Sequence, residues 1–217
     1  GDDLLVGGPK GDTMAGGPGD DTIFVQDAGD KVVELAKGGT DTVVASVDFA
    51  LPANVENLTL TGRKALKGKG NRGANTIRGN AGNNRIDAGA GADQVHGGLG
   101  DDIIIGGKGA DVLTGGGGAD RFVYRKTAES SGRSVDTITD FSAKKGDRID
   151  LSLIDADSRK AGNQPFDFIG SRAFSRKPGQ LRFAKGLLEG DVNGDGRADI
   201  KIKLKGVKTL PKKAVIR

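Results

Sequence analysis

The sequence predicts an all-β protein: a parallel β-roll, in which short strands wind into a solenoid, followed by a small C-terminal β cap. Three observations predict this fold. A nine-residue pattern repeats in one register through residues 70–123. Short alternations of apolar and polar residues indicate strands, whereas helical periodicity is nearly absent. Glycine accounts for 38 of 217 residues and aromatic residues for 4%, so turns rather than a large side-chain core are expected to organise the backbone.

The central repeat assigns a role to each of its nine positions. Written in nines, residues 70–123 read GNRGANTIR, GNAGNNRID, AGAGADQVH, GGLGDDIII, GGKGADVLT and GGGGADRFV. Positions one to six predict a turn, with glycine where the backbone needs positive φ or close approach. Positions seven to nine predict a short strand with one inward side chain. The inward residues at position eight are Ile77, Ile86, Val95, Ile104, Leu113 and Phe122. Two nonapeptides therefore form one coil of 18 residues, with a turn on each side.

Position six holds an acid or its amide, and stacking places these residues above one another. Asn75, Asp93 and Asp111 fall on one side, and Asn84, Asp102 and Asp120 fall on the other. With the backbone carbonyls of the glycine turns they form a cage of oxygen atoms, which suits calcium with its roughly 6–8 oxygen ligands. Zinc would need Cys or His, and the chain has no Cys and one His. The predicted turn ligands are Gly89, Gly91, Gly97, Gly98, Leu99, Gly100, Gly106, Gly107, Lys108, Gly109, Gly115, Gly116 and Gly118. The alternative is that the Gly-Asp clusters only form turns.

Residues 1–44 contain a rougher set of the same repeats. Residues 7–15 read GGPKGDTMA and residues 16–24 read the nearly ideal GGPGDDTIF, whereas the next two blocks keep the acid but lose the leading glycines. We expect good metal sites from Asp3 and Asp21, and weaker ones from Asp12, Asp30 and Asp41, because missing glycines restrict the turn. The predicted turn ligands are Gly7, Gly8, Gly16, Gly17 and Gly19. Because the chain opens in the middle of a repeat, we expect it to be a fragment of a longer protein.

Residues 45–69 break the register. Val47, Phe49 and Leu51 alternate with polar residues, NVENLTLTG indicates a second strand, and RKALKGKG contains no acid. The segment is predicted to continue the stack as irregular coils without metal; a flexible linker is the alternative. Together with the repeats of residues 1–44 and 70–123, these coils define a predicted β-roll domain of residues 1–124.

After residue 124 the repeat pattern ends. Residues 124–134 are polar and typical of a loop, and strands are predicted in VDTITDF, DRIDLSLI, LRF, ADIKIKL and AVIR. Residues 125–217 are therefore predicted to form a β cap. Such a cap shields the last coil, whose apolar face would otherwise be exposed.

These motifs resemble two related families. The nonapeptide G-G-x-G-x-D-x-U-x, in which U is a large apolar residue, is similar to the calcium-binding repeat of the RTX (repeats-in-toxin) hemolysin-type proteins. GGGGADRFVYRKTAESSGRSVDTITDFSAKKGDRIDLS resembles the C-terminal domain of serralysin-type secreted metalloproteases, and the likeness extends into FDFIG, GQLRF and GDVNGDGRADIKIKL. The resemblance implies several bound Ca²⁺ ions. It also implies that Glu129, Asp136 and Asp147 close the last calcium site; ordinary surface acids are the alternative.

The resemblance further implies a protein exported from a Gram-negative cell by type I secretion machinery. In one respect the chain departs from that family, whose C-termini end in an acid followed by apolar residues. This chain ends in KKAVIR, which puts a secretion signal of its own in doubt.

A second calcium motif lies in residues 191–199. Asp191, Asn193, Asp195 and Asp199, with Gly196, match the first part of an EF-hand loop, although Ile202 stands where the bidentate Glu belongs. Asn-Gly and Asp-Gly in the same loop are equally good hairpin-turn signals. Both a calcium loop and a plain tight turn are therefore open.

No catalytic motif is found, so we expect no enzyme within this chain. His96 is the only histidine, which excludes an H-E-x-x-H zinc site, and a structural or surface role is predicted for it. No run approaches the ~20 apolar residues of a transmembrane helix. Nucleic acid is not expected as a partner, because there is no basic helix, stacking aromatic pair or binding motif.

Charge divides the chain. Residues 142–217 hold 18 Lys and Arg against 9 Asp and Glu, and the other 141 residues hold 15 against 20. The basic part predicts attraction to a polyanion, such as an alginate-like acidic polysaccharide or an anionic cell surface; a merely solvated surface is the alternative. The sequence thus predicts a secreted, extracellular calcium-binding module that folds on Ca²⁺ outside the cell and supports a larger exported protein. A polysaccharide-binding module of a secreted enzyme is the alternative function.

Overall fold

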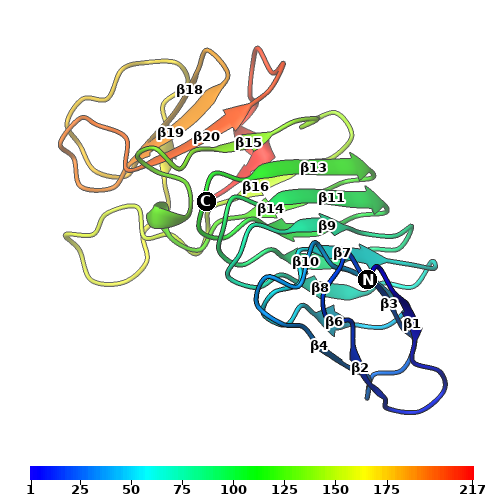
Figure 1. Ribbon diagram of the computed structural model, residues 1–217. Helices are drawn as coiled ribbons and strands as arrows, with labels where there is room; N and C mark the ends of the chain where they lie inside the picture. The colour runs from blue at the N-terminus through cyan, green and yellow to red at the C-terminus, as the bar shows by residue number, and fades with distance from the viewer.

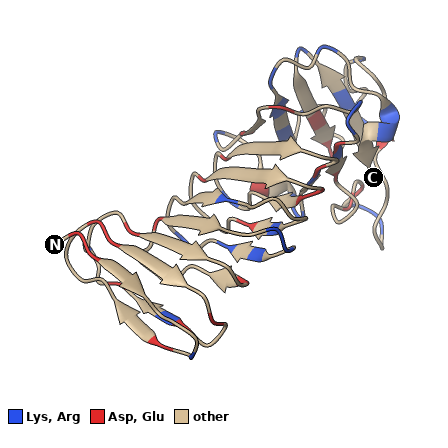
Figure 2. Ribbon diagram, turned by 90° about the vertical axis from the view of Figure 1, so that its right-hand side faces the viewer, with Lys and Arg blue, Asp and Glu red and all other residues tan.

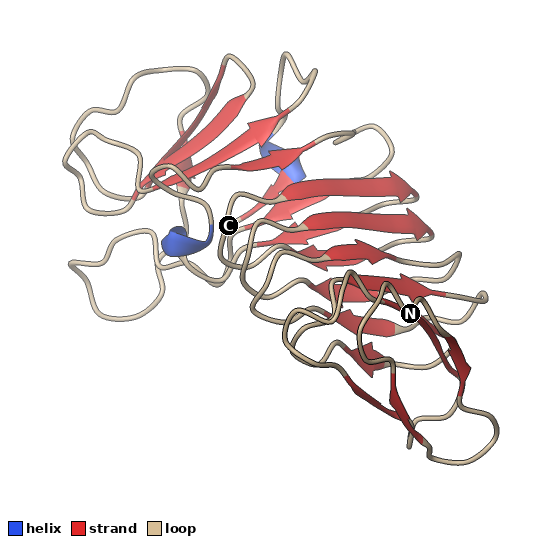
Figure 3. Cartoon of the chain, in the orientation of Figure 1, coloured by secondary structure: helices blue, strands red, loops and turns tan.

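The computed structural model covers residues 1–217 and is a parallel β-roll that carries further β structure at its C-terminal end (Figure 1). The solenoid has about seven turns, and its strands stack in parallel on two sides. Figure 3 shows strands throughout, with helix confined to two short segments. The predicted all-β fold with a parallel β-roll is therefore confirmed.

One side of the solenoid is a continuous sheet whose strands pair in parallel. Its solenoid strands are β1 (Leu4–Val6), β3 (Thr22–Val25), β5 (Thr42–Ala45), β7 (Asn57–Leu60), β9 (Thr76–Arg78), β11 (Gln94–Leu99), β13 (Val112–Gly117) and β15 (Asp136–Ile138). In the central repeats Ile77 pairs with Val95 and Val95 pairs with Leu113, so each step equals two nonapeptides. This is the register that the sequence predicts.

The other side of the solenoid is divided into two sheets. The strands β2 (Thr13–Ala15) and β4 (Lys31–Val33) form a separate pair. The remaining strands are β6 (Phe49–Ala50), β8 (Lys67–Lys69), β10 (Arg85–Asp87), β12 (Ile103–Ile105), β14 (Arg121–Val123), β16 (Arg148–Asp150) and β21 (Val215–Ile216). The sheet on this side is thus interrupted between β4 and β6.

The core of the solenoid is a column of position-eight side chains. Ile77, Ile86, Val95, Ile104 and Phe122 are all fully buried. In β9 and β10 they alternate with half-buried or exposed residues, so each of these strands contributes one inward side chain between the sheets, whereas in β12 and β14 the following residue, Ile105 or Val123, is buried as well. Burying one such side chain contributes about 1.5–3 kcal/mol, a modest amount for a coil that must order many glycines.

Residues 45–69 continue the stack. β7 pairs in parallel with β5 before it and β9 after it, and β8 pairs with β6 and β10. Leu58 and Leu60 are buried in the same core column. The segment is thus a pair of irregular coils in the solenoid.

The C-terminal part adds a hairpin layer to the end of the roll. β17 (Asp167–Phe168), β18 (Gln180–Ala184), β19 (Leu187–Asp191) and β20 (Ile200–Leu204) extend the first sheet, and β18, β19 and β20 pair antiparallel. β20 pairs with β15, and β16 pairs with β14, so both solenoid sheets run on past residue 124. The predicted boundary between residues 124 and 125 stays a prediction.

Helical structure is limited to η1 (Thr127–Glu129) and η2 (Lys212–Ala214), both 3₁₀ helices. η1 lies within the segment that the sequence predicts as a loop. Neither is long or apolar enough to cross a membrane.

Candidate metal sites

The residues at position six line up in two columns, one along each row of turns. The first ladder consists of the residues two positions before the central apolar residue of the first-sheet strands: Asp3, Asp21, Asp41, Glu56, Asn75, Asp93, Asp111 and Asp136. The second ladder consists of the corresponding residues on the other side: Asp12, Asp30, Asn84, Asp102, Asp120 and Asp147. Figure 2 shows the acidic residues at the turns along the solenoid.

Apart from Asp3 and Asp12 in the first coil, each carboxylate in the ladders uses one oxygen to accept a backbone N–H of the preceding coil. Oδ1 of Asp111 accepts the backbone N–H of Asp93 at 2.9 Å, and Oδ1 of Asp120 accepts that of Asp102 at 3.0 Å. In Asp93, Asp102 and Asp111 the other oxygen, Oδ2, is buried and has no hydrogen-bond partner. None of the lysine or arginine side chains forms an ion pair with these carboxylates. A buried carboxylate oxygen without a partner is costly, so each one requires a cation or a proton.

The pKa values of the ladder aspartates reflect the same unfavourable burial of negative charge. Burial, reinforced by the charge of the stacked Asp111, raises the pKa of Asp93 to about 7. Burial likewise raises the pKa of Asp102 and Asp120 to about 6 and that of Asp136 to about 8. Without a counter-charge, these stacked carboxylates resist ionisation.

Glycine is required where the turns of successive coils touch. Gly107 and Gly109 have φ of +94° and +144°, and a Cβ on either would overlap the backbone carbonyl oxygen of Gly89 or Gly91 in the preceding coil. A Cβ on Gly97 would likewise overlap Oδ2 of Asp102. The turns therefore bring backbone carbonyls and bare carboxylate oxygens together, and no nitrogen or sulfur ligand lies among them. This donor set fits calcium, a hard cation that takes oxygen ligands.

Asparagine replaces aspartate where a regular coil meets the irregular coils. The amide nitrogen of Asn75 donates to the carbonyls of Val55 and Glu56 at 3.1 and 3.3 Å. Asn71 and Asn80, which occupy position two, likewise donate to carbonyls of residues 52–64. Their contacts with the irregular coils are therefore made by amide N–H groups and need no cation. Toward the next coil, the backbone N–H groups of Asn75 and Asn84 still bond Asp93 and Asp102.

The N-terminal repeats vary along their length. Oδ2 of Asp21 and of Asp41 is buried without a partner, as in the central repeats. Asp30 differs, because its two oxygens accept three backbone N–H groups, from Asp12, Gln26 and Asp27. These donors, Asp12 first, hold the pKa of Asp30 below its ordinary value. Asp3 is exposed at the open end of the stack, and Asp12 is half-buried.

The C-terminal part completes both ladders. Oδ1 of Asp136 accepts the N–H of Asp111 at 3.0 Å, and Oδ1 of Asp147 accepts that of Asp120 at 3.1 Å. These are the positions that the next repeat would fill. The two residues lie on opposite ladders, so the structure does not bring Glu129, Asp136 and Asp147 to one site.

Glu129 lies on the side of the first ladder. It lines a cavity of 390 Å³ together with Gly89 and Lys108, and its charge raises the pKa of Asp111 after the effect of burial. Oε1 of Glu129 also forms an ion pair with Nε of Arg125 at 3.0 Å. An arginine thus competes with a metal for this side chain.

Three carboxylates that the sequence analysis missed also hold turns. Glu56 accepts the N–H of Asp41 and extends the first ladder into the irregular coils. Glu34 accepts the N–H groups of Gly16 and Gly17, and Asp140 accepts those of Gly115 and Gly116. Glu56 is detectable from the sequence, since it stands two residues before Leu58 as Asp93 does before Val95. Glu34 and Asp140 lie outside position six, and no repeat signal marks them.

The loop of residues 191–199 is closed by its own backbone. Asp191 is fully buried, but its two oxygens accept the N–H groups of Gly194 and Gly196 at 2.6 and 2.9 Å. Asp195 and Asn193 accept N–H groups within the loop, and Asp199 accepts that of Val192. This is the bonding of a tight turn, which leaves no bare buried oxygen.

The other predicted positions lie as follows. The side chains of Leu99 and Lys108 are exposed, so only their backbone carbonyls are available to the turns. His96 is half-buried in β11, between Arg78 and Thr114 on the adjacent strands.

Stacked turns, two carboxylate ladders and oxygen-only cages define a calcium-binding parallel β-roll. Comparison with known families agrees. Residues 70–216, more than half of the chain, match the family Peptidase M10 serralysin C terminal, and residues 1–30 match the RTX calcium-binding nonapeptide repeat (4 copies). The chain belongs to the serralysin C-terminal family and carries RTX calcium-binding repeats. Both matched regions are non-catalytic, and both are typical of secreted proteins.

Individual relatives match only in part. The chain is 44% identical over 50 residues to the endo-1,3-1,4-beta-glycanase ExsH of Rhizobium meliloti, and 37% identical over 65 residues to the glycanase EglC of the same organism. These stretches cover 23% and 30% of this chain, but 11% and 14% of the two glycanases. The AlgE6R3 subunit of the Azotobacter vinelandii mannuronan C5-epimerase is 24% identical in sequence, covers 77% of this chain and 86% of its own, and superimposes with a TM-score of 0.41. The fold described here rests on the strand pairings and not on this likeness.

Proposed function

We propose that this chain is a calcium-dependent folding module of a larger secreted protein. One observation carries the proposal: six buried aspartates of the two ladders have an Oδ2 that no protein group satisfies, namely Asp21, Asp41, Asp93, Asp111 and Asp136 on the first ladder and Asp102 on the second. In the calcium-free chain, ionisation of these groups opposes stacking of the coils. The small position-eight side chains then have to offset the conformational entropy of many glycine residues without help.

Bound calcium would supply positive charge between the coils. The chain's own residues do the rest: Oδ1 of a ladder aspartate such as Asp111 accepts a backbone N–H of the preceding coil, and its Oδ2 has no protein partner. Asp147 differs, because its Oδ2 accepts the N–H of Ser142. Asp93, Asp111 and Asp136 would hold ions on the first ladder, and Asp102, Asp120 and Asp147 on the second. Because the cages exist only when coils stack, calcium-binding free energy becomes folding free energy.

The concentration of free calcium would then decide where the module folds. Extracellular calcium modules have dissociation constants of about 10⁻⁴–10⁻³ M. A module of that affinity stays unfolded in the cytosol, passes an export channel as an extended chain and folds outside. Type I machinery is the proposed exporter, and the parent protein's activity would reside in residues outside this chain.

A calcium titration of the metal-free chain, followed by far-ultraviolet circular dichroism, tests this function. We expect a cooperative gain of β signal with a midpoint between about 10⁻⁴ and 10⁻³ M calcium. Magnesium serves as the control, since it demands a smaller octahedral site and should not reproduce the transition. A chain that is equally folded in chelator and in calcium would contradict the proposal.

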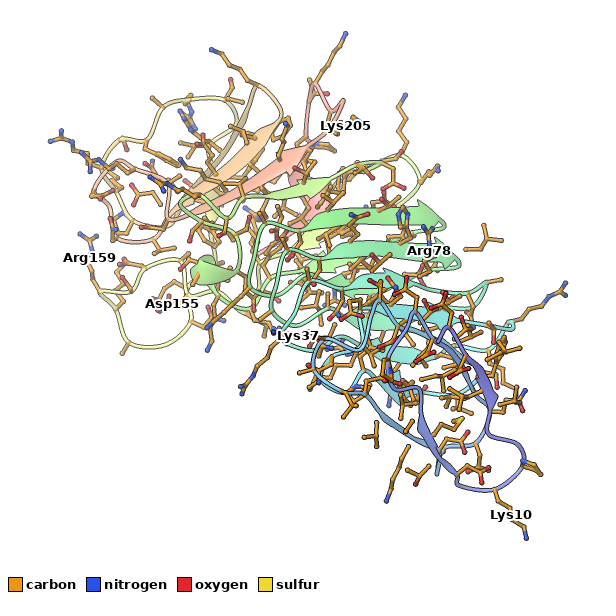
Figure 4. The ribbon with its side chains drawn as sticks, in the orientation of Figure 1. Lys10, Lys37, Arg78, Asp155, Arg159 and Lys205 are labelled. Carbon is orange, nitrogen blue, oxygen red and sulfur yellow. The ribbon has the colours of Figure 1, made fainter.

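A second candidate function is the binding of an acidic polysaccharide. It is favoured by two adjoining cavities of 880 and 480 Å³ at the C-terminal end, which share Gly206, Val207 and Lys208. Six lysines line them and no Asp or Glu does; the lysines are Lys144, Lys185, Lys203, Lys205, Lys208 and Lys213. None of the six makes an ion pair. Figure 2 shows blue residues gathered on this end of the molecule, and in Figure 4 Lys205 extends outward from it.

Alginate binding in saturating calcium separates the two functions. If this surface holds a polyanion, affinity should fall with added salt, and Lys203→Gln with Lys208→Gln should weaken binding. Lys10→Gln with Lys37→Gln, at exposed sites far from the cavities, is the matched control. Absence of salt-sensitive binding would remove this candidate and leave the folding function untouched.

A further inference from the structure

The turn that follows β4 differs from every regular turn in its first residue. In the central repeats a strand is followed by glycine, or in one block by Ala88, and the acid or amide comes five positions later, as in Gly106 and Asp111. After β4 the first residue is Glu34, and Asp41 comes seven positions later. The turn is therefore two residues longer and carries a carboxylate where the repeat has glycine or alanine.

The side chain of Glu34 occupies a place that a backbone carbonyl fills beside Gly97 in the central repeats; Asp140, which accepts the N–H groups of Gly115 and Gly116, makes comparable contacts at the C-terminal end. Beside Gly97, the neighbouring turn contributes Oδ2 of Asp102 and the carbonyl oxygen of Gly115. Beside Gly16, the corresponding contacts are Oδ2 of Asp21 and Oε1 of Glu34, with Oε1 2.6 Å from the position of an added Cβ. A carboxylate oxygen thus replaces a neutral carbonyl oxygen of the cage.

Three buried carboxylates meet at this point. One oxygen from each of Asp21, Glu34 and Asp41 lies within 4.8 Å of the others, and the residues are 1%, 7% and 0% exposed. Oδ2 of both aspartates has no hydrogen-bond partner. No lysine or arginine pairs with any of the three. The unpartnered, fully buried oxygens point to a cation, and the third carboxylate adds a negative charge that the central sites lack.

We propose that Glu34 is a metal ligand and that the site of Asp21, Glu34 and Asp41 is the tightest calcium site of the chain and the first to fill. The inference rests on the proposed calcium-dependent folding, because it ranks one site within that process. Affinity in calcium sites rises with the number of charged ligands and the rigidity of the site. Both oxygens of Glu34 are held by backbone N–H groups, at 2.8 Å from Gly16 and 3.2 Å from Gly17, so its carboxylate is fixed in place. Ordering would then begin in the N-terminal repeats.

Isothermal titration of the metal-free chain with calcium alone tests the ranking. For the unaltered chain we expect one tight site before a weaker group. Glu34→Gln removes the charge but keeps an acceptor for the glycine N–H, and should weaken the tight site about tenfold and leave the weaker group unchanged. Asp27→Asn is the control: it makes the same charge change in the same coil, where Oδ1 of Asp27 accepts only the N–H of Gly29.

A second variant, Glu34→Gly, keeps the test valid if Glu34→Gln does not fold. It places at this position the residue that the repeat uses. It too should lose the tight site. Calcium affinities identical to those of the unaltered chain in both variants would overturn the inference, as would a loss of thermal stability at saturating calcium with the tight site intact. These results differ from a failure of the proposed function, in which the unaltered chain itself would not respond to calcium.

Discussion

Residues 70–84, where the repeats meet the irregular coils of residues 45–69, and the repeat coils of residues 85–123 solve one problem in two ways. Both must join stacked turns across a polar edge. The first junction uses asparagine amides, such as that of Asn71, whose nitrogen donates to the carbonyls of Pro52 and Val55 at 2.7 and 2.8 Å. The repeat coils use Asp93, Asp102 and Asp111, whose Oδ2 atoms are left bare. At Asn71 and Asn75 the amide edge is satisfied by protein groups, whereas the carboxylate edge needs a cation and can therefore be switched.

The largest expected effect is that of pH on the metal-free chain, because it acts on several carboxylates at once. In the folded state the pKa values of Asp93, Asp102, Asp120 and Asp136 are raised to between about 6 and 8. Protonation therefore stabilises the fold fully below about pH 4, the unfolded value, and this stabilisation is lost as pH rises through 6 to 8. Circular dichroism of the metal-free chain should show more β structure at pH 5 than at pH 8.

In the same experiment the calcium midpoint should rise as pH falls, because protons and calcium compete for the same oxygens. The asparagine edge does not titrate in this range. A metal-free chain with the same β signal at pH 5 and pH 8 would show that the buried carboxylates do not control folding.

The next largest effect is expected from substitutions at two glycines with positive φ, of which only one contacts the turn of another coil. Gly62 in the irregular coils has φ of +86° with open space around a Cβ, whereas at Gly107, with φ of +94°, a Cβ would overlap a carbonyl of the preceding coil. Gly62→Ala should cost about 1–2 kcal/mol from the left-handed backbone alone. Gly107→Ala should cost more than about 3 kcal/mol, because overlap adds to strain. Urea unfolding at saturating calcium measures both; equal losses would refute close turn-to-turn contact.

Replacement of one ladder aspartate in the repeat coils by asparagine should have a moderate effect on the calcium midpoint of folding. Asp111→Asn keeps an oxygen for the N–H of Asp93 but removes the charge that faces the cage. We expect the calcium midpoint of folding to rise about tenfold, or about 1.4 kcal/mol. Asp101→Asn, an exposed neighbour of the ladder, is the control and should change the midpoint little. An unchanged midpoint in Asp111→Asn would exclude Asp111 as a ligand.

The smallest effect is expected from the amide edge. Asn71→Ala removes two hydrogen bonds to backbone carbonyls and should cost about 1–2 kcal/mol. Since no ion is involved, the loss should be the same at two saturating calcium concentrations in urea unfolding. A loss that disappears as calcium is raised would mean that this edge also binds metal.

The sequence was sufficient for the regular part of the molecule. A strict period of nine fixes the strand register. The amino-acid sequence alone therefore predicts the inward side chains Ile77 and Val95 and the first-ladder residues Asp93 and Asp111. Where the period slips, the outcome differed: the continuation of the stack through residues 45–69 was predicted, but the role of Glu34 was not. The insertion before Asp41 hides the role of Glu34, because its contact with Gly16 depends on the course of a longer turn.

The C-terminal part was predicted less completely. β19 was missed, since LLEGD lacks clear alternation and the turn that joins it to β18 is Lys185–Gly186, with φ of 52° and 78°. That turn has the geometry of an Asn-Gly hairpin without its usual first residue. The antiparallel pairing of β18, β19 and β20 depends on contacts between distant segments, which a pattern of local alternation does not encode.

A crystal structure of this chain grown in saturating calcium tests the central claim most directly. The account predicts calcium, identified by its anomalous scattering, between Asp93 and Asp111 on the first ladder and between Asp102 and Asp120 on the second. Ordered coils whose Oδ2 atoms face neither a metal nor a proton donor would contradict it.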